Sequence, residues 1–415
     1  MASRRVRIQR RAKRLFGYWR AERRTLRQGL VALAISSVAG FVAGLTLSGI
    51  SGTLKTFPGF LILIPAAVGM RGTIFGAIGA RLGTQNAAGT FEISFRKGSA
   101  LRENVYVAIA TTFSSSLWLG VLAKLAAAAS GHPSISVGDL ITISVVGGVL
   151  GSAFILAITV GLSVLSYRRG WDLDSVSTPM VTALGDMATL PTLFLATFLL
   201  HDRAIANAAT VVCIVIAVVA TVRSYTVHDA VIRRIALEMT AVILLTPILD
   251  IVSGALQESR LQELLQVPVL LTLIPPFVSQ AGALGGIFAS RISSKLQIGV
   301  VTPKGFPEVP ALVDASIVLG LGLVVFSLIG VVAVGLTSIA HHVVQPGLVV
   351  LGTIIAGLIA TPVTIVLSYY LAIVTYRFGL DPDNQTVPII TSVMDLAGVA
   401  GILVVMTLLG VLTHG

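Results

Sequence analysis

The chain has 415 residues, of which 55% are hydrophobic and only 11% are charged, and its mean hydropathy is +0.94. Because soluble domains contain about 25% charged residues, this composition excludes a water-soluble globular enzyme and indicates a polytopic membrane protein. The net charge of +11 is typical of a nucleic-acid-binding protein, but residues 1–28 alone contribute +10 of it. We therefore predict no nucleic-acid partner, and we expect this basic tail to contact anionic membrane lipids.

From the N-terminus onward, eleven segments are apolar and long enough to cross a bilayer, which needs about 20 helical residues. The predicted spans cover 29–50, 58–82, 105–128, 138–166, 176–200, 205–222, 235–256, 267–292, 312–338, 347–375 and 386–412. Backbone groups in lipid must bond internally, and these segments are too long for barrel strands. We therefore predict an all-α fold.

The distribution of Lys and Arg among the loops predicts the orientation of the chain in the membrane. With residues 1–28 in the cytoplasm, the inner loops carry eleven basic residues and the outer loops carry three, Lys55, Arg203 and Arg260. We expect a multi-pass protein of the cell (plasma) membrane with a cytoplasmic N-terminus. Because the number of spans is odd, the C-terminus is expected outside.

Two blocks of sequence occur twice at nearly the same spacing. Residues 57–84 (FPGFLILIPAAVGMRGTIFGAIGARLGT) align without gaps with residues 267–294 (VPVLLTLIPPFVSQAGALGGIFASRISS), 210 positions later. Residues 165–190 (LSYRRGWDLDSVSTPMVTALGDMATL) align with residues 374–399 (VTYRFGLDPDNQTVPIITSVMDLAGV), 209 positions later. Two blocks at one spacing indicate the duplication of a five-helix unit.

The duplication predicts how the chain is organised. The basic tail (1–28) precedes a first five-helix repeat (29–200), and a linker span with its loop (201–234) precedes the second repeat (235–415). The extra span returns the chain to the cytoplasm, so both repeats start inside. They are then parallel repeats, related by a pseudo-two-fold axis along the membrane normal. One chain mimics a homodimer, and we expect it to function as a monomer.

Ionisable residues inside spans are costly and are candidate functional residues. Asp186 and Asp395 occupy equivalent positions about ten residues into the fifth span of each repeat, roughly 15 Å deep. Thr182 and Thr391 precede them by one turn on the same helix face. Two carboxylates facing each other match the charge of a divalent cation, and Mg²⁺, which keeps most of its waters, suits a site with few direct ligands. Alternatively, each aspartate bonds a Thr or Ser hydroxyl and only stabilises packing.

Several other features allow two interpretations. Pro and Gly in the second spans either interrupt the helices and free carbonyl oxygens for a cation, or permit close helix packing. Asp174 and Asp383, at the cytoplasmic start of the fifth spans, either concentrate cations or complement the helix dipoles. Glu238 and Asp250 have no acidic counterpart in the first repeat. We expect structural pairing for both, with Arg71 as a candidate partner.

These motifs resemble the MgtE-type magnesium transporters, and more closely the duplicated solute carrier family 41 branch. The segments IPAAVGMRGTIFGAIGARLGT, WDLDSVSTPMVTALGDMATL and LDPDNQTVPIITSVMDLAGV carry the resemblance, which extends over nearly all of 29–412. It implies a pathway between the repeats, lined by the second and fifth helices, with Asp186 and Asp395 at the metal site. The residues expected to line this pathway are Gly69, Gly72, Gln280, Gly282, Asp174 and Asp383.

The sequence thus predicts a transporter, not an enzyme, with Mg²⁺ as its expected substrate and Mn²⁺ or other divalent cations left open. One alternative is a secondary transporter of an organic solute, although an aromatic content of 6% provides few stacking surfaces. The other is an intramembrane aspartyl protease, in which two aspartates share a proton. Against it, Ala183 stands where the GxGD pattern of such proteases has its first glycine.

Overall fold

The computed structural model describes residues 23–87, 92–169, 173–227, 229–340, 343, 345–378 and 382–412. All regular structure in these residues is helical, and eleven of their helices are long and apolar enough to cross a membrane. The predicted all-α polytopic class and the predicted number of spans are therefore confirmed. Most of the predicted basic tail, residues 1–22, lies outside the described residues.

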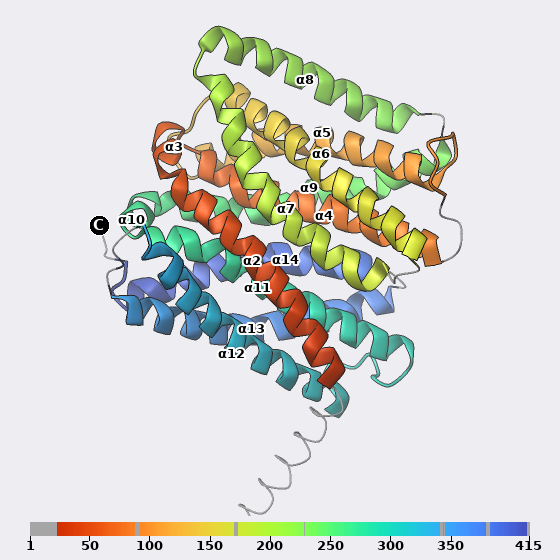
Figure 1. Cartoon of the computed structure of the whole chain (residues 1–415), viewed down its shortest axis with the longest axis vertical. Helices are drawn as coiled ribbons and strands as arrows, with labels where there is room; N and C mark the ends of the chain where they lie inside the picture. The colour runs from red at the N-terminus through yellow and green to blue at the C-terminus, as the bar shows by residue number, and fades with distance from the viewer. Residues whose placement is uncertain are drawn as a thin grey trace, which may run out of the picture.

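The helices follow one another with short connections (Figure 1). They are α2 (Arg23–Gly49), α3 (Ser51–Thr56), α4 (Phe60–Ala87), α5 (Ala100–Ala129), α6 (Val137–Arg169), α7 (Leu173–Thr197), the 3₁₀ turn η1 (Phe198–Leu200), α8 (Arg203–Thr226), α9 (Ala230–Ser259), α10 (Leu261–Gln266), α11 (Pro268–Gln297), α12 (Val309–Thr337), α13 (Pro346–Arg377) and α14 (Pro382–Leu408). Several extend beyond the predicted spans because polar residues cap them. Asp202 and Asp229, for example, accept hydrogen bonds from the first amides of α8 and α9.

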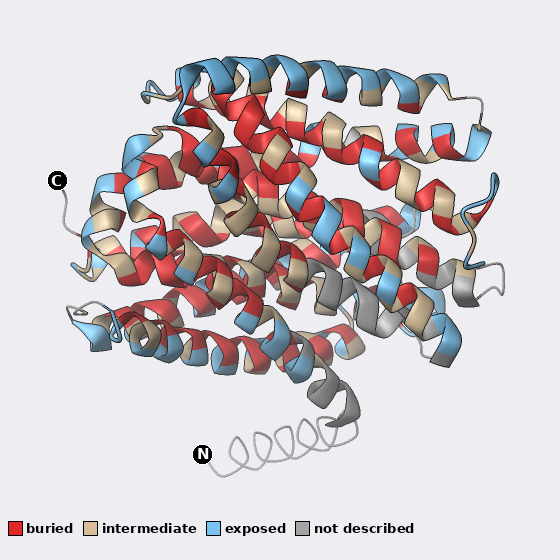
Figure 2. Ribbon diagram, turned by 45° about the horizontal axis from the view of Figure 1, so that its top comes forward, coloured by how far each residue is buried: buried red, intermediate tan, exposed pale blue. Residues whose placement is uncertain are grey.

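The helices of the second half recur at the spacing of the sequence blocks. The short helices α3 and α10 start 210 residues apart, and α7 and α14 start 209 residues apart. Figure 1 shows α3 and α10 at the same end of the bundle, as two halves running in the same direction require. Helix α8 has no such counterpart. It lies at the periphery against α5 and α6, and its outward face is exposed and apolar, as expected of a surface in contact with lipid (Figure 2).

The first helix of each half packs on the second helix of the other half. Helix α2 lies mainly against α11 and also against its own α7, and α9 lies against α4 and its own α14. Glycines at equivalent positions allow both crossings, because Gly44 faces the carbonyl of Thr272 and Gly254 faces the carbonyl of Ile62. Small residues let helix backbones approach closely in membranes. The two halves therefore interlock through α2 and α9.

The prolines do not interrupt the second spans. Helix α4 continues through Pro65, and α11 continues through Pro275 and Pro276. Of the two interpretations, the one in which these prolines interrupt the helices is therefore wrong. A neighbouring helix covers the carbonyl that a proline leaves without its usual N–H donor: the carbonyl of Thr272, four residues before Pro276, packs on Gly44 of α2.

Candidate metal site

Asp186 and Asp395 lie at the centres of equivalent helices. Asp395 is the central residue of α14, and Asp186 is one residue past the centre of α7. Asp186 is buried, Asp395 is partly exposed, and the two carboxylates are close enough to interact electrostatically. At this depth a carboxylate needs a polar or positively charged partner beside it, because hydrocarbon does not solvate charge.

One serine from the opposite half contacts Asp186, and a second serine contacts the first. The Ser279 hydroxyl of α11 donates to Asp186 Oδ2 at 3.1 Å, and the hydroxyl oxygens of Ser279 and Ser36 of α2 are 3.0 Å apart. The interpretation in which an aspartate bonds a serine hydroxyl therefore applies to Asp186. The donor belongs to the opposite half, so the bond joins the two halves at the centre of the fold.

A second carboxylate accompanies Asp395. The carboxyl groups of Asp395 and Asp250 of α9 are within hydrogen-bonding reach of each other. Both lie beside Gly69 of α4, where an added Cβ would be 2.7 Å from Asp250 Oδ2 and 3.7 Å from Asp395 Oδ2. Hydroxyls from Ser253 and Ser392 lie nearby, the first donating to the Asp395 backbone carbonyl at 2.8 Å and the second lying beside the Asp250 carboxyl group.

The predicted pairing of Asp250 with Arg71 is wrong. Arg71 is 2% exposed, and its guanidinium lies against Gly148 of α6, where it donates to the carbonyl of Ala67. Among the described residues Arg71 forms no ion pair, and its Nε has no hydrogen-bond partner. The long side chain extends along α4 toward α6, whereas Asp250 reaches α4 from α9 on another side.

Glu238 behaves as expected. Its carboxylate pairs with Arg234 on the same helix at 2.8 Å and with Arg81 of α4 at 3.8 Å. Both bridges are partly exposed and lie away from the aspartates, so Glu238 has a structural role.

Four of the predicted site residues take part in packing. The Thr391 hydroxyl donates to carbonyls of its own helix, and its methyl group lies 3.0 Å from where a Cβ on Gly282 would stand. The amide of Gln280 donates to the carbonyl of Leu33 at 2.9 Å, while its buried Oε1 has no partner among the described residues. Gly72 lies in α4 beside Gly185 of α7.

The side chains of Thr182, Asp174 and Asp383 lie outside the described residues, although their backbones belong to α7 and α14. Their part in the site stays a prediction.

The direct ligand set around the aspartates is small. In the part of the chain that the structure describes, no three His, Cys, Asp or Glu side chains are arranged to ligate one metal ion together. An ion at this place would have to keep water between itself and some of the carboxylates. Mg²⁺ binds proteins in this manner, through one or two carboxylates and several retained waters.

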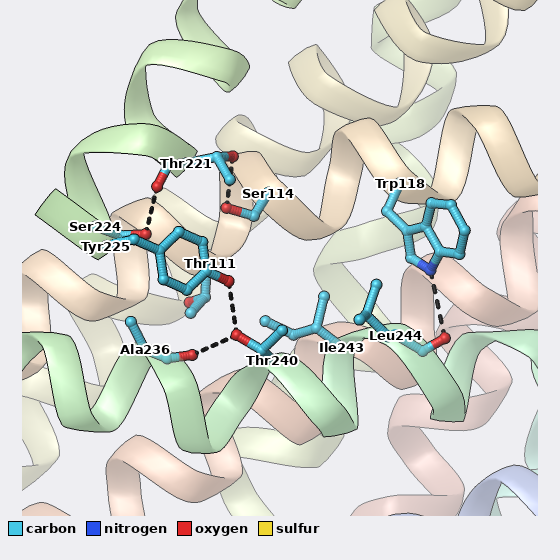
Figure 3. A pocket seen from close by; sticks show the side chains of 10 residues that line it. All are labelled: Thr111, Ser114, Trp118, Thr221, Ser224, Tyr225, Ala236, Thr240, Ile243 and Leu244. Atoms are coloured by element: carbon cyan, nitrogen blue, oxygen red, sulfur yellow. Dashed lines mark hydrogen bonds between the residues drawn. The ribbon is translucent and has the colours of Figure 1, made fainter.

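A pocket of about 130 Å³ lies apart from the aspartates, between α5, α8 and α9 (Figure 3). Its lining hydroxyls bond to one another or to backbone carbonyls, as in the contact of Tyr225 with Thr240 at 2.6 Å and that of Ser114 with Thr221 at 2.8 Å. It holds no acidic side chain. This pocket therefore lacks the charge that a divalent cation needs.

Sequence reasoning missed Asp250 and Ser279 as neighbours of the predicted aspartates. A difference between the aligned repeats could have indicated them. Asp250 stands 210 residues after Gly40, and Ser279 stands 210 residues after Gly69, so a polar residue replaces a glycine at each position. A polar residue that replaces glycine in one of two otherwise similar helices indicates a local change of function as much as a paired residue does.

Comparison with known proteins supplies the family. A model of the MgtE family, described as a divalent cation transporter, matches residues 64–196 and 274–405. Solute carrier family 41 member 3 of Rattus norvegicus is 25% identical over 409 residues, covering 89% of this chain and 84% of the relative.

Among solved structures, the eukaryotic MATE transporter AtDTX14 is 13% identical with a TM-score of 0.40, covering 95% of this chain and 97% of that one. An inward-facing multidrug resistance MATE family transporter of the MOP superfamily is 14% identical with a TM-score of 0.27, covering 92% and 95%. TM-scores this low do not indicate a shared fold. The family matches, by contrast, cover more than half of the chain and contain both α7 and α14 aspartates. The chain belongs to the MgtE family of divalent cation transporters.

Proposed function

We propose that the chain carries Mg²⁺ across the membrane between its two halves, and that Asp186 and Asp395 bind the cation on the way. The supporting observation is the pair of carboxylates at the centres of α7 and α14, near enough to interact electrostatically. Negative charges at this depth repel each other and are poorly solvated, so both costs fall when a cation lies between them.

The cation binds in a partly hydrated form. Few direct ligands surround the aspartates, and hydroxyls such as that of Ser279 are placed to bond either a carboxylate or a bound water. Mg²⁺ dehydrates reluctantly, so a site that accepts several of its waters favours it over cations that need six to eight protein oxygens. Thr182 and Thr391, one turn from the aspartates, are proposed to contact the same hydration shell.

The proposal includes an orientation. The N-terminus lies in the cytoplasm and the C-terminus outside, in the cell membrane, since Lys and Arg gather in the loops on the N-terminal side. The chain acts as a monomer, because its two halves supply both aspartates. Residues 1–28 bind anionic lipid.

Purified protein in liposomes that contain a Mg²⁺-sensitive dye tests the proposal. The variants are Asp186→Asn, Asp395→Asn and the double substitution, with Glu238→Gln as the control because Glu238 lies in a separate, partly exposed ion pair. We expect each site variant to reduce Mg²⁺ uptake at least tenfold and the control to match the wild type. Undiminished uptake by the double variant would refute the assignment of the site.

The same liposomes distinguish the substrate class. Mg²⁺ uptake should fall when Mn²⁺ is added as a competitor and should be unaffected by organic cations at the same concentration. Inhibition by an organic solute with no inhibition by Mn²⁺ would favour the alternative of an organic-solute transporter.

A further inference from the structure

Asp250 is a buried acid that the proposed pair of aspartates does not use. It is 1% exposed, and its Oδ1 has no hydrogen-bond partner among the described residues. Its Oδ2 lies beside Gly69, and its carboxyl group reaches that of Asp395. A buried unpartnered carboxylate oxygen costs several kcal/mol, on the order of the penalty for any unpaired buried charge. Such an oxygen next to a second carboxylate indicates a missing positive partner.

The two halves surround their aspartates differently. In the alignment, the positions of Asp250 and Ser392 around Asp395 correspond to Gly40 and Ala183 around Asp186. A carboxylate and a hydroxyl therefore accompany the aspartate of the second half, where the first half has a glycine and an alanine.

The second helices of the two halves also differ beside the aspartates. Ser279 of α11 donates to Asp186, whereas the equivalent residue of α4 is Gly69. The absence of a side chain at Gly69 leaves room for the Asp250 carboxylate, because a Cβ there would lie 2.7 Å from its Oδ2. One aspartate thus has a serine partner and the other has a second aspartate.

A buried cation breaks the symmetry on the other side. Arg71 stands where the second half has Ala281, and its Cβ lies about 4.0 Å from where a Cβ on Gly185, the neighbour of Asp186, would stand. The guanidinium is buried without an ion pair among the described residues. With all groups ionised, Asp250 and Asp395 sum to −2, whereas Asp186 alone carries −1 and Arg71, directed toward α6, adds +1 to the first half.

The negative potential is therefore concentrated on the side of the second half. Coulomb interactions in a low-dielectric interior are several-fold stronger than in water, so a divalent cation moves toward the more negative pair. Two carboxylates in contact also repel each other unless a cation or a proton lies between them. Both effects favour the same position, beside Asp250.

We infer that Asp250 is the third acidic residue of the transport site, and that the divalent cation binds off the pseudo-two-fold axis, nearer Asp250 and Asp395 than Asp186. This inference rests on the proposed function and adds a residue and a position to it. Arg71 adds a positive charge to the first half, with its guanidinium directed toward α6, and so increases the difference between the halves. Water fills the remaining coordination positions, since no three acidic side chains ligate one ion directly in the described residues.

Equilibrium binding of Mn²⁺ to the purified full-length protein, followed by electron paramagnetic resonance, tests the inference alongside Mg²⁺ uptake in liposomes. Asp250→Asn should weaken Mn²⁺ binding at least tenfold. Arg71→Met should tighten it, and the double variant should bind with intermediate affinity because it keeps a net charge of −2 from the two remaining aspartates. Glu238→Gln, an acid-to-amide change on the same helix in a separate ion pair, is the matched control and should change binding less than threefold.

A variant that retains the charge separates a binding role from a packing role. Asp250→Glu should bind Mn²⁺ more tightly than Asp250→Asn, because it keeps the negative charge, although its extra methylene must shift the packing beside Gly69. If Asp250 only fills space, Glu should be at least as harmful as Asn, and this result would overturn the inference. Size-exclusion chromatography of every variant checks that it folds.

The outcomes for Asp250 and Asp395 are separable. If Asp395→Asn abolishes uptake and Asp250→Asn binds and transports like the wild type, the inference is refuted and the proposed function stands. If neither substitution affects uptake or binding, both the inference and the proposed site fail.

Discussion

The crossing of α9 over α4 has no room for a methyl group at Gly254. An alanine Cβ there would lie 2.8 Å from the carbonyl carbon and the Cα of Ile62, whereas ordinary contact begins near 3.4 Å. The obstacle is backbone, which cannot rotate away, and the carbonyl oxygen of Ile62 lies closer still, so the two helices must separate by more than about 0.6 Å. Overpacking of this kind costs about 1–3 kcal/mol. The higher helix propensity of alanine returns at most about 1 kcal/mol. We therefore expect Gly254→Ala to destabilise the protein by about 1–2 kcal/mol.

Denaturant unfolding of the purified protein in detergent measures this effect as a shift of the midpoint. Gly161→Ala is the matched control, because Gly161 lies within α6 with nothing within 4 Å of an added Cβ. It should leave stability unchanged or raise it. Gly44→Ala, at the equivalent crossing of α2 over α11, should destabilise like Gly254→Ala. Equal stability of all three variants and the wild type would refute the interlocked arrangement of the two halves.

Three further predictions concern single residues. Asp314→Asn should destabilise the protein by about 3 kcal/mol, because it removes the fully buried carboxylate that pairs with two basic side chains of α11 at 2.5 and 2.6 Å; the same unfolding assay measures this. Gly69→Ala should weaken Mn²⁺ binding several-fold, because the new Cβ would lie 2.7 Å from Asp250 Oδ2 and displace it; an unchanged affinity would contradict this. In the loop before α12, hydrogen bonds from the side chains of Thr302 and then Lys304 lower the pKa of Glu308. A lowered carboxyl pKa stabilises the fold above its unfolded value near 4.3 and loses that contribution as the pH falls further. Proteolysis of the loop should therefore accelerate below about pH 4, and Glu308→Gln should remove the pH dependence.

The number of spans and the repetition of the halves were predictable, but the packing partner of α2 was not. Hydropathy reports only whether a segment is long and apolar enough to cross the bilayer. Because α4 and α11 derive from similar sequences, the glycine face of α2 suits either of them, and no sequence pattern distinguishes packing within a half from packing between halves. The structure places α2 on α11 and α9 on α4.

The continuity of α4 and α11 through their prolines was also beyond sequence rules. A proline removes one backbone donor, and the consequence depends on what covers the carbonyl left without it. In α11 the glycine of a neighbouring helix packs on that carbonyl. The local sequence around Pro276 contains no record of Gly44, which is more than 200 residues away.

Some residues of the candidate site were predictable from the sequence, and others depend on how the helices pack. Asp186 and Asp395 were predictable because the repeat carries them to equivalent depths. Asp250 was assigned a structural role because it lacks an acidic counterpart, and that reasoning gives weight only to symmetric features. The contact that matters, with Asp395 beside Gly69, depends on how α9 crosses α4. Three-dimensional packing decides it.

The single occurrence of Asp250 and Arg71 follows from the fusion of two halves in one chain. In a symmetric homodimer every substitution occurs twice, so an Asp250-like residue would place four carboxylates at the axis, and an Arg71-like residue would bury two unpaired guanidiniums. Four buried negative charges repel each other strongly, and two buried positive charges would oppose entry of a cation. A fused chain escapes this constraint, because one half can gain a carboxylate while the other gains a base. The three aspartates and Arg71 then sum to −2 with all groups ionised, and the negative charge lies mainly on the side of the second half. A site of this kind holds its cation nearer the helices of one half than those of the other. The second half of this chain, with Asp250, Asp395 and Ser392, carries that side.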